Sequence, residues 1–217
     1  MMRLYYHPYS DNARRAVMTA LSLDVPVELA AVDLRKGDQR EPWFLKLNPN
    51  HRVPVLVDDE FVLWESHAIM QYLADKTPGQ NIYPTDIHAR ADVNRWLFWC
   101  AQHLGPAIGI LNREHVLKRL MGLGEADSAE VQRGEDLVHE FAAVLDTHLA
   151  CREWICPGGL TLADLAIVAP FTGLLAAAAP GKLPISGYVH VRRWLAAMET
   201  LDAWQKTIVV LPRPIGP

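Results

Sequence analysis

The first third of the chain alternates short apolar runs with one helical stripe. Residues 3–6 form a run typical of a strand, and apolar residues recur at helical spacing over 13–23. A second strand-like run covers 27–32, after a stop at Asp24-Val25-Pro26. These elements predict a β-α-β unit with a right-handed crossover, so its two strands should lie parallel.

The pattern then predicts a short helix, a hairpin and another helix. The helix is expected at 41–47, and two apolar runs at 53–57 and 61–64 are separated by a turn. A helical stripe begins near Ala68. The resulting order, β-α-β-α-β-β-α, is that of a thioredoxin-like α/β domain.

A stretch rich in Pro and Gly at 76–84, KTPGQNIYP, is typical of an interdomain linker. Helical periodicity follows over 86–120, 128–149 and 188–200, and Gly105-Pro106 is placed to kink or divide the first of these. We therefore expect a thioredoxin-like domain, a linker and an all-α domain, over 1–76, 77–86 and 87–217.

The segment 160–165, LTLADL, is a helix-start signal. Thr161 and Asp164 have the spacing of a capping box, so we expect Asp164 to serve folding and not acid catalysis. The apolar run 165–179 predicts a central buried helix, and 211–214 predicts an extended tail.

Composition narrows the classes of function. The 217 residues are 50% hydrophobic, which is enough for a full core. A net charge of −4 does not indicate the basic surface that binding of nucleic acid requires. No apolar run approaches the length of a membrane span, so we expect no membrane association and a cytoplasmic protein. Three cysteines without CxxC spacing predict buried free thiols, with no disulfide framework and no metal site: Cys100, Cys151 and Cys156.

Two residue pairs differ from ordinary packing positions. Val53-Pro54 lies where a strand begins, and a cis bond there would turn the Val53 N–H and C=O outward. Glu65-Ser66 lies between a strand and a helix, where a hydroxyl and free first-turn N–H groups suit a carboxylate. Together they predict a site for a peptide-like ligand. The alternative is that Pro54 only starts an edge strand and Ser66 only caps a helix.

Ser10 lies between the first strand and the first helix. A hydroxyl and helix N–H groups there can stabilise a thiolate, and such donors lower a thiol pKa from about 8.5 by a unit or more. No G-x-S-x-G elbow surrounds Ser10, so the attacking atom is expected to belong to the ligand. The alternative is that Ser10 is an ordinary N-cap.

The stretch NPNHRVPVLVDDEFVLWESHAIMQYLA, residues 48–74, resembles the glutathione-binding half of cytosolic glutathione S-transferases. YSDNARRA resembles the segment in which Ser-type members, the theta- and delta-like groups and many bacterial proteins, carry the serine that activates the thiol. The resemblance covers nearly the whole chain and implies the two-domain transferase fold. It departs at His67, where related sequences often have Arg.

The resemblance implies roles for individual residues. Ser10 would activate the glutathione thiol, and the Val53 backbone before cis-Pro54 would pair with the cysteinyl unit. Glu65 and Ser66 would hold the γ-glutamyl end. The looser matches, expected to contact the glycyl carboxylate, are Gln39, His51 and Arg52. Tyr6 and Tyr9 are rivals to Ser10, because Tyr-type members use a tyrosine near this point.

The resemblance also implies a reaction, attack of the glutathione thiolate on a small, apolar electrophile by a homodimer. The alternatives are a glutathione-dependent isomerase or peroxidase, and a non-catalytic binding protein of the same fold. An apolar second-substrate pocket is expected between the domains, with its candidates on the first long helix: Trp96, Trp99 and His103. Glutathione is the expected co-substrate, and no ligand cluster supports a metal.

Overall fold

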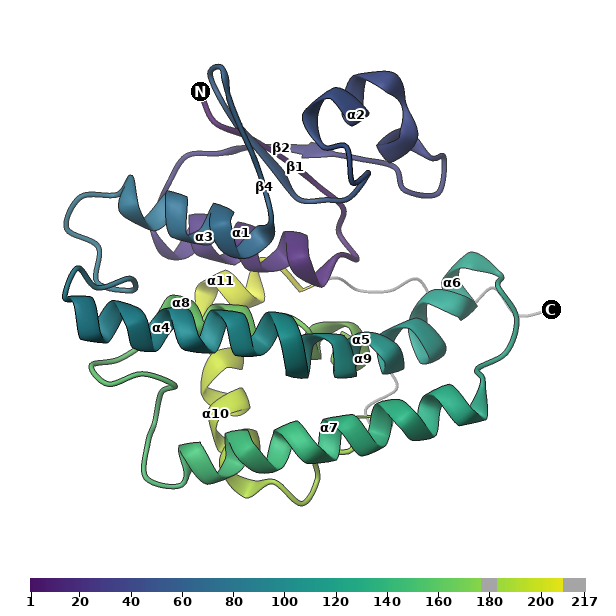
Figure 1. Cartoon of the computed structure of the whole chain (residues 1–217), viewed down its shortest axis with the longest axis vertical. Helices are drawn as coiled ribbons and strands as arrows, with labels where there is room; N and C mark the ends of the chain where they lie inside the picture. The colour runs from purple at the N-terminus through teal and green to yellow at the C-terminus, as the bar shows by residue number, and fades with distance from the viewer. Residues whose placement is uncertain (177–182, 209–217) are drawn as a thin grey trace.

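A computed structural model describes residues 1–176 and 183–208 and has an α/β part stacked on a helical part (Figure 1). The strands are β1 (Arg3–Tyr6), β2 (Glu28–Ala31), β3 (Val55–Asp58) and β4 (Phe61–Trp64). They form one sheet in the order β2-β1-β3-β4, in which β1 and β2 are parallel and the other neighbours antiparallel. The predicted thioredoxin-like order and the parallel pairing are confirmed.

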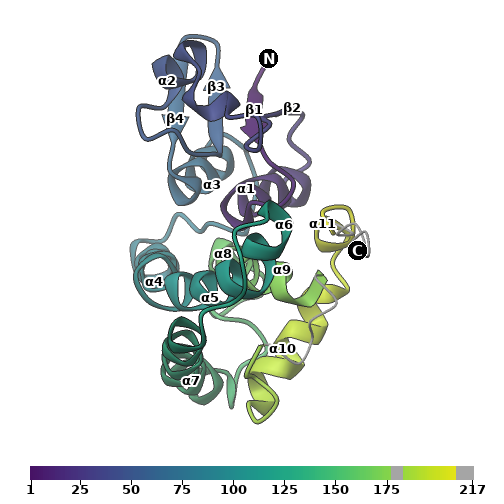
Figure 2. The ribbon, with the colours of Figure 1, turned by 90° about the vertical axis from the view of Figure 1, so that its right-hand side faces the viewer.

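The two faces of the sheet bury different side chains, because successive residues of a strand point to opposite faces. Leu4 and Leu56, paired across β1 and β3, pack against the helices α1 (Asp11–Ser22) and α3 (Ser66–Asp75). Val55 packs with Phe44 of α2 (Pro42–Leu47), which follows the short η1 (Asp38–Arg40). Figure 2 shows α1 and α3 between the sheet and the helical part.

The helical part is built around α8, in which every residue is buried. Its helices are α4 (Ile87–Trp99), α5 (Gly105–Asn112), α6 (Lys118–Met121), α7 (Ser128–Leu149), α8 (Leu162–Val168), α9 (Phe171–Ala176), α10 (Val189–Glu199) and α11 (Asp202–Gln205). Met18 of α1 and Met70 of α3 are buried in the same core as these helices, so the two parts share apolar contacts. No helix in residues 1–176 and 183–208 combines the length and hydropathy needed to span a membrane.

The first long helix is interrupted, as Gly105-Pro106 predicted. A π-helical turn, η2 (Cys100–Leu104), joins α4 to α5, and the Gly105 N–H bonds to the Cys100 carbonyl five residues back. A Cβ at Gly105 would lie 2.7 Å from that carbonyl oxygen, so only glycine fits. A second π-helical turn, η3 (Arg113–Leu117), was not predicted. It buries the carboxylate of Glu114, which accepts from the Asp127 N–H at 2.8 Å.

Two other expectations need correction. The single helix predicted over 165–179 is divided at Pro170, because proline cannot continue the hydrogen-bond ladder: α8 ends before it and α9 starts after it. Residues 177–179 and the predicted tail 211–214 lie outside the described residues. Cys100 and Cys156 are buried free thiols as expected, but Cys151 is exposed.

The capping box at the start of α8 is confirmed. The Asp164 carboxylate is fully buried and accepts four hydrogen bonds, and burial raises its pKa. The Thr161 N–H and hydroxyl donate at 2.9 and 3.0 Å, the Ile155 N–H at 2.9 Å and the Trp194 Nε1–H at 3.0 Å. The side chain therefore ties α8 to α10 and to the loop after α7.

Candidate functional site

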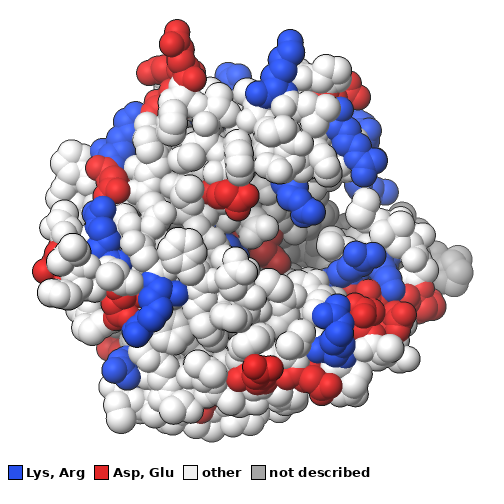
Figure 3. Space-filling view, viewed as in Figure 1, with Lys and Arg blue, Asp and Glu red and all other residues white. Residues whose placement is uncertain are grey.

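An open cleft of about 690 Å³ lies between the two parts of the molecule, within the size range of small-molecule sites. Figure 3 shows this face hollowed between the α/β part above and the helices below. The α/β part supplies His7, Tyr9, Ser10, Asp11, Asn12, Arg15, Leu34, Arg35, Gln39, His51, Arg52 and Val53 to its lining. The helical part supplies Cys100, Ala101, Gly105, Pro106, Gly109, Asn112, Leu117, Leu120, Met121 and Pro170.

Ser10 lines this cleft and is also the N-cap of α1. Its backbone is extended, with φ −92° and ψ 111°, and its Oγ accepts a hydrogen bond from the Ala13 N–H at 3.2 Å. The cap uses Oγ only as an acceptor, so the hydroxyl proton stays free to donate into the cleft. The cap and the proposed chemistry are thus compatible roles of one side chain.

The loop before β3 presents peptide groups to the cleft. The Val53-Pro54 bond is cis, and among the described residues no backbone hydrogen bond engages the Val53 N–H or C=O. Buried Asn48 holds the loop by donating from Nδ2 to the Arg52 carbonyl at 2.8 Å. A peptide-like ligand can therefore pair with Val53 as an added strand.

The first turn of α3 is uncapped by any side chain. Glu65 is its N-cap residue and has a positive φ of 71°, a conformation that costs a non-glycine residue about 1–3 kcal/mol. Ser66 follows at the start of the helix and is buried. The first-turn N–H groups and the Ser66 hydroxyl can donate hydrogen bonds to a carboxylate, and exposed Glu65 lies beside them.

The structure brings most of the predicted site residues together. Those that line the cleft are Ser10, Gln39, His51, Arg52 and Val53, whereas Pro54, Glu65 and Ser66 lie outside its lining. Arg35, which was not among the predicted site residues, also lines the cleft and adds a further cation to its lining.

Arg15 links the cleft to the start of α3. Arg14 and Arg15 of α1 are only 5% and 4% exposed, because α3 and α11 cover them. Arg15 Nη1 lies 2.8 Å from His67 Nε2, and burial together with the Arg15 charge lowers the pKa of His67 to about 2. The imidazole is therefore a neutral acceptor, which accounts for histidine at the position where Arg was expected.

The aromatic candidates for the second-substrate pocket lie elsewhere. Trp96 contacts His148 with ring centroids 4.4 Å apart, and Trp99 and His103 contact Phe141 at 6.2 and 5.1 Å. Since both partners belong to α7, this stripe packs between helices, and the three residues do not line the cleft in the described structure.

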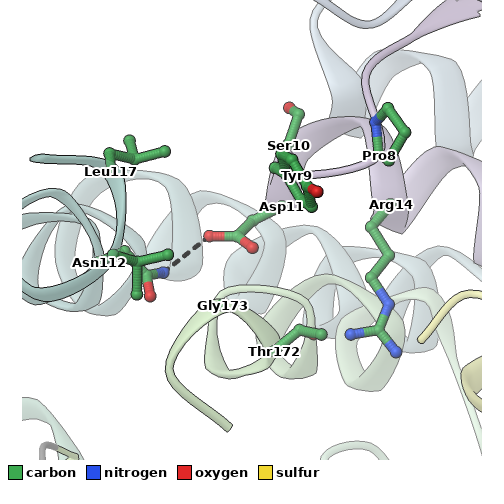
Figure 4. A pocket seen from close by; sticks show the side chains of 10 residues that line it. Pro8, Tyr9, Ser10, Asp11, Arg14, Asn112, Leu117, Thr172 and Gly173 are labelled. Atoms are coloured by element: carbon green, nitrogen blue, oxygen red, sulfur yellow. Dashed lines mark hydrogen bonds between the residues drawn. The ribbon is translucent and has the colours of Figure 1, made fainter. Parts of the chain in front are cut away.

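Asn112 ties the two parts together at the floor of the cleft. Its Nδ2 donates to Asp11 Oδ2 at 2.9 Å, as Figure 4 shows, and to the Pro170 carbonyl at 3.0 Å. Gly173 of α9 packs directly against this amide, and a Cβ there would lie 2.5 Å from Asn112 Oδ1. No sequence pattern indicates this contact, because the residues that form it are far apart in the chain.

We expect Gly173→Ala to lower the free energy of unfolding by about 1–3 kcal/mol, because the new methyl group overpacks the Asn112 amide. Gly109→Ala is the matched control. Gly109 lies in α5, and no described atom lies within 4 Å of the position that a Cβ would take, so this change should raise the free energy of unfolding by about 0.5–1 kcal/mol. Urea unfolding measures both. Equal changes in the two variants would contradict the close packing at Gly173.

Comparison with known proteins gives consistent results along the chain. The family described as "Glutathione S-transferase, N-terminal domain" matches residues 1–75, and "Glutathione S-transferase, C-terminal domain" matches 128–197. Glutathione S-transferase F10 of Arabidopsis thaliana is 31% identical, over 99% of this chain and 100% of its own length. Glutathione S-transferase 3 of Zea mays is 32% identical, over 100% and 97%.

The fold has solved counterparts as well. The crystal structure of glutathione transferase F2 from Populus trichocarpa superimposes with a TM-score of 0.89 at 26% identity, covering 96% of this chain and 97% of that one. The similarity therefore includes the relative placement of the α/β and helical parts.

Proposed function

The chain belongs to the glutathione S-transferase family, and we propose that it is a Ser-type member in which the Ser10 hydroxyl stabilises the glutathione thiolate. It is a glutathione transferase with glutathione as its co-substrate. The single observation that carries the proposal is the position of Ser10, a cap residue in the cleft whose hydroxyl proton has no acceptor among the described residues. We also propose that it belongs with the theta- and delta-like or bacterial members. The relatives named above are plant proteins and do not test that placement.

In the proposed reaction, the glutathione thiol releases its proton to solvent and the thiolate accepts a hydrogen bond from Ser10. The sulfur then attacks an electrophilic carbon, a C–S bond forms, and the leaving group departs with its electron pair. A hydrogen-bond donor aimed at an anion stabilises that anion far more in a partly enclosed cleft than in water. The protein needs no base of its own for this step.

The same proposal assigns the rest of glutathione. The cysteinyl backbone pairs with Val53, the γ-glutamyl carboxylate binds at Ser66 and the first turn of α3, and Glu65 faces the ammonium. Gln39, His51 and Arg52 bind the glycyl carboxylate, and Arg35 joins them as a further cation in the cleft lining.

We also propose that the electrophile is small and apolar, that the protein is a homodimer, as is usual in the family, and that it acts in the cytoplasm. The proposed domains are 1–76 for glutathione and 87–217 for the electrophile, joined by 77–86.

The test of the Ser-type assignment compares Ser10 with its tyrosine rivals. Tyr6 packs in the apolar cluster under α1 and α3, and Tyr9 lines the cleft, so only Tyr9 competes in position. We expect Tyr6→Phe and Tyr9→Phe to keep kcat/KM for 1-chloro-2,4-dinitrobenzene within about threefold of the wild type, because neither hydroxyl is the donor. A loss as large as that of Ser10→Ala in either variant would transfer the role to tyrosine.

We expect Ser66→Ala to raise the glutathione Kd by about 10-fold, because a hydrogen bond to a carboxylate contributes about 1.5–3 kcal/mol. Ser128→Ala is the matched control, since Ser128 is also the first residue of a helix but is exposed on α7. Calorimetric titration with glutathione measures both. Binding by Ser66→Ala as tight as that of Ser128→Ala would remove Ser66 from the proposed site.

A further inference from the structure

A second, smaller pocket of about 60 Å³ opens beside Ser10 on the side of the helical part. Its walls are mainly apolar and come from Pro8 and Tyr9 before α1 and from Val116 and Leu117 of η3. Figure 4 shows two charged side chains of α1 at this pocket, Asp11 toward Asn112 and Arg14 beside Thr172. The glutathione assignment uses neither of them.

Arg14 is a buried cation with one unused donor. Its Nε donates to Thr207 Oγ1 at 2.9 Å, its Nη2 donates to the Trp204 carbonyl at 3.1 Å, and the guanidinium lies 4.1 Å from the Trp204 ring centroid. Among the described residues, Nη1 is buried without a hydrogen-bond partner. Burial lowers the pKa of Arg14 to about 10, so the group remains a cation at neutral pH.

A buried N–H without an acceptor is costly, and a buried guanidinium N–H most of all. Within the part of the chain that the structure describes, the only carboxylate in the lining of this pocket is that of Asp11, which is already bonded to Asn112. An anionic group of a ligand at Arg14 would supply the missing acceptor and part of the missing countercharge.

We propose that this pocket selects electrophiles that carry a carboxylate on an apolar body, with the carboxylate at Arg14 Nη1 and the reactive carbon near the sulfur at Ser10. This inference rests on the proposed function and names the substrate class of the same site. The pocket has a volume of about 60 Å³, which has room for the carboxylate group, and the aromatic or alkyl body lies in the adjoining cleft of about 690 Å³, whose lining shares Ser10 and Leu117 with the pocket. The Arg14 cation distinguishes an acid from its neutral ester.

Asp11 makes this selection dependent on pH. The groups that act on it are Arg14 and Arg15 of α1 and the Asn112 amide of α5, which donates to it. Burial raises the pKa of Asp11 to about 7, against the attraction of the two arginines. Below that pH Asp11 is largely protonated and the pocket is more positive, so an acidic electrophile should bind better there than above it.

The experiment uses 4-chloro-3-nitrobenzoate and its methyl ester, which differ in charge and by one methyl group. In both, the glutathione sulfur bonds to the carbon that bears chlorine and chloride leaves. Each kcat/KM is divided by the second-order rate constant of the same substrate with free glutathione, which removes the difference in intrinsic reactivity. We expect the wild type to favour the acid by about 10-fold, and by more near pH 6 than near pH 8.

Arg14→Gln should bring the ratio of acid to ester close to one, and Asp11→Asn, which keeps an acceptor for Asn112, should remove the pH dependence of the ratio. If Arg14→Gln does not fold, competitive inhibition of the wild type by 4-nitrobenzoate and by its methyl ester supplies the same comparison. A wild-type ratio of one or less, or a preference that Arg14→Gln leaves intact, overturns the inference.

Turnover of the neutral 1-chloro-2,4-dinitrobenzene separates the two proposals. A protein that turns it over but does not favour the acid keeps the proposed function and loses this inference. Inactivity toward all three electrophiles overturns both.

Discussion

Replacing Ser10 with alanine is expected to lower kcat/KM for glutathione and 1-chloro-2,4-dinitrobenzene by about 100-fold. The methyl group cannot donate to the sulfur, so the pKa of the bound thiol returns toward about 8.5 and the thiolate fraction falls at neutral pH. Steady-state rates at saturating glutathione separate this loss from any loss of binding, because the γ-glutamyl and glycyl contacts do not involve Ser10.

The cap at α1 needs its own control, because the Ser10 Oγ also accepts from Ala13. Removing such a cap costs about 0.5–2 kcal/mol of stability. Ser10→Asp keeps the cap but places a negative charge against the thiolate, so it should be stable and inactive, whereas Ser10→Thr should retain most activity. Activity in Ser10→Asp close to that of the wild type would show that the residue only caps the helix.

Asp164→Ala is expected to lower the free energy of unfolding by about 3–5 kcal/mol, one of the largest effects available at a single position. The change leaves four buried donors without an acceptor: the Thr161 N–H and hydroxyl, the Ile155 N–H and the Trp194 Nε1–H. Because these donors belong to α8, to α10 and to the loop after α7, the helical domain loses a junction and not only a cap. Urea unfolding followed by tryptophan fluorescence measures the change.

Asp202→Ala is the matched control for Asp164, since Asp202 also lies in the first turn of a helix but has an exposed side chain. Its exposed ion pair with Lys206 is worth less than about 1 kcal/mol. Comparable losses of stability in the two variants would contradict the buried network. If Asp164→Ala remains folded, the pKa of the glutathione thiol bound to it should equal that in the wild type, because Asp164 does not line the cleft in the described structure.

Much of the fold follows from local patterns in the sequence. The apolar runs around Leu4 and Val55 predict strands, and the Thr161–Asp164 spacing predicts the capping box that the structure has. The sequence also indicates the bend at Val53-Pro54 and the helix start at Glu65-Ser66, although each pair alone equally fits a proline that starts an edge strand or a serine that caps a helix.

The remaining features depend on contacts between distant segments. The break at Pro170 lies within an apolar run whose composition alone favours a single helix. Arg14 and Arg15 look like surface residues until α3 and α11 cover them. The bond between Asp11 and Asn112 joins residues 101 positions apart, so no periodicity or motif could indicate it.

The most direct test of the account is the pKa of the glutathione thiol when it is bound. Ultraviolet absorbance of the bound thiolate, recorded over about pH 5 to 9, gives this value for the wild type and for Ser10→Ala. We expect both proteins to bind glutathione tightly, and the pKa of the bound glutathione thiol to be at least about one unit lower in the wild type than in Ser10→Ala. Equal thiol pKa values in the two proteins would contradict it, because Ser10 would then be a helix cap and nothing more.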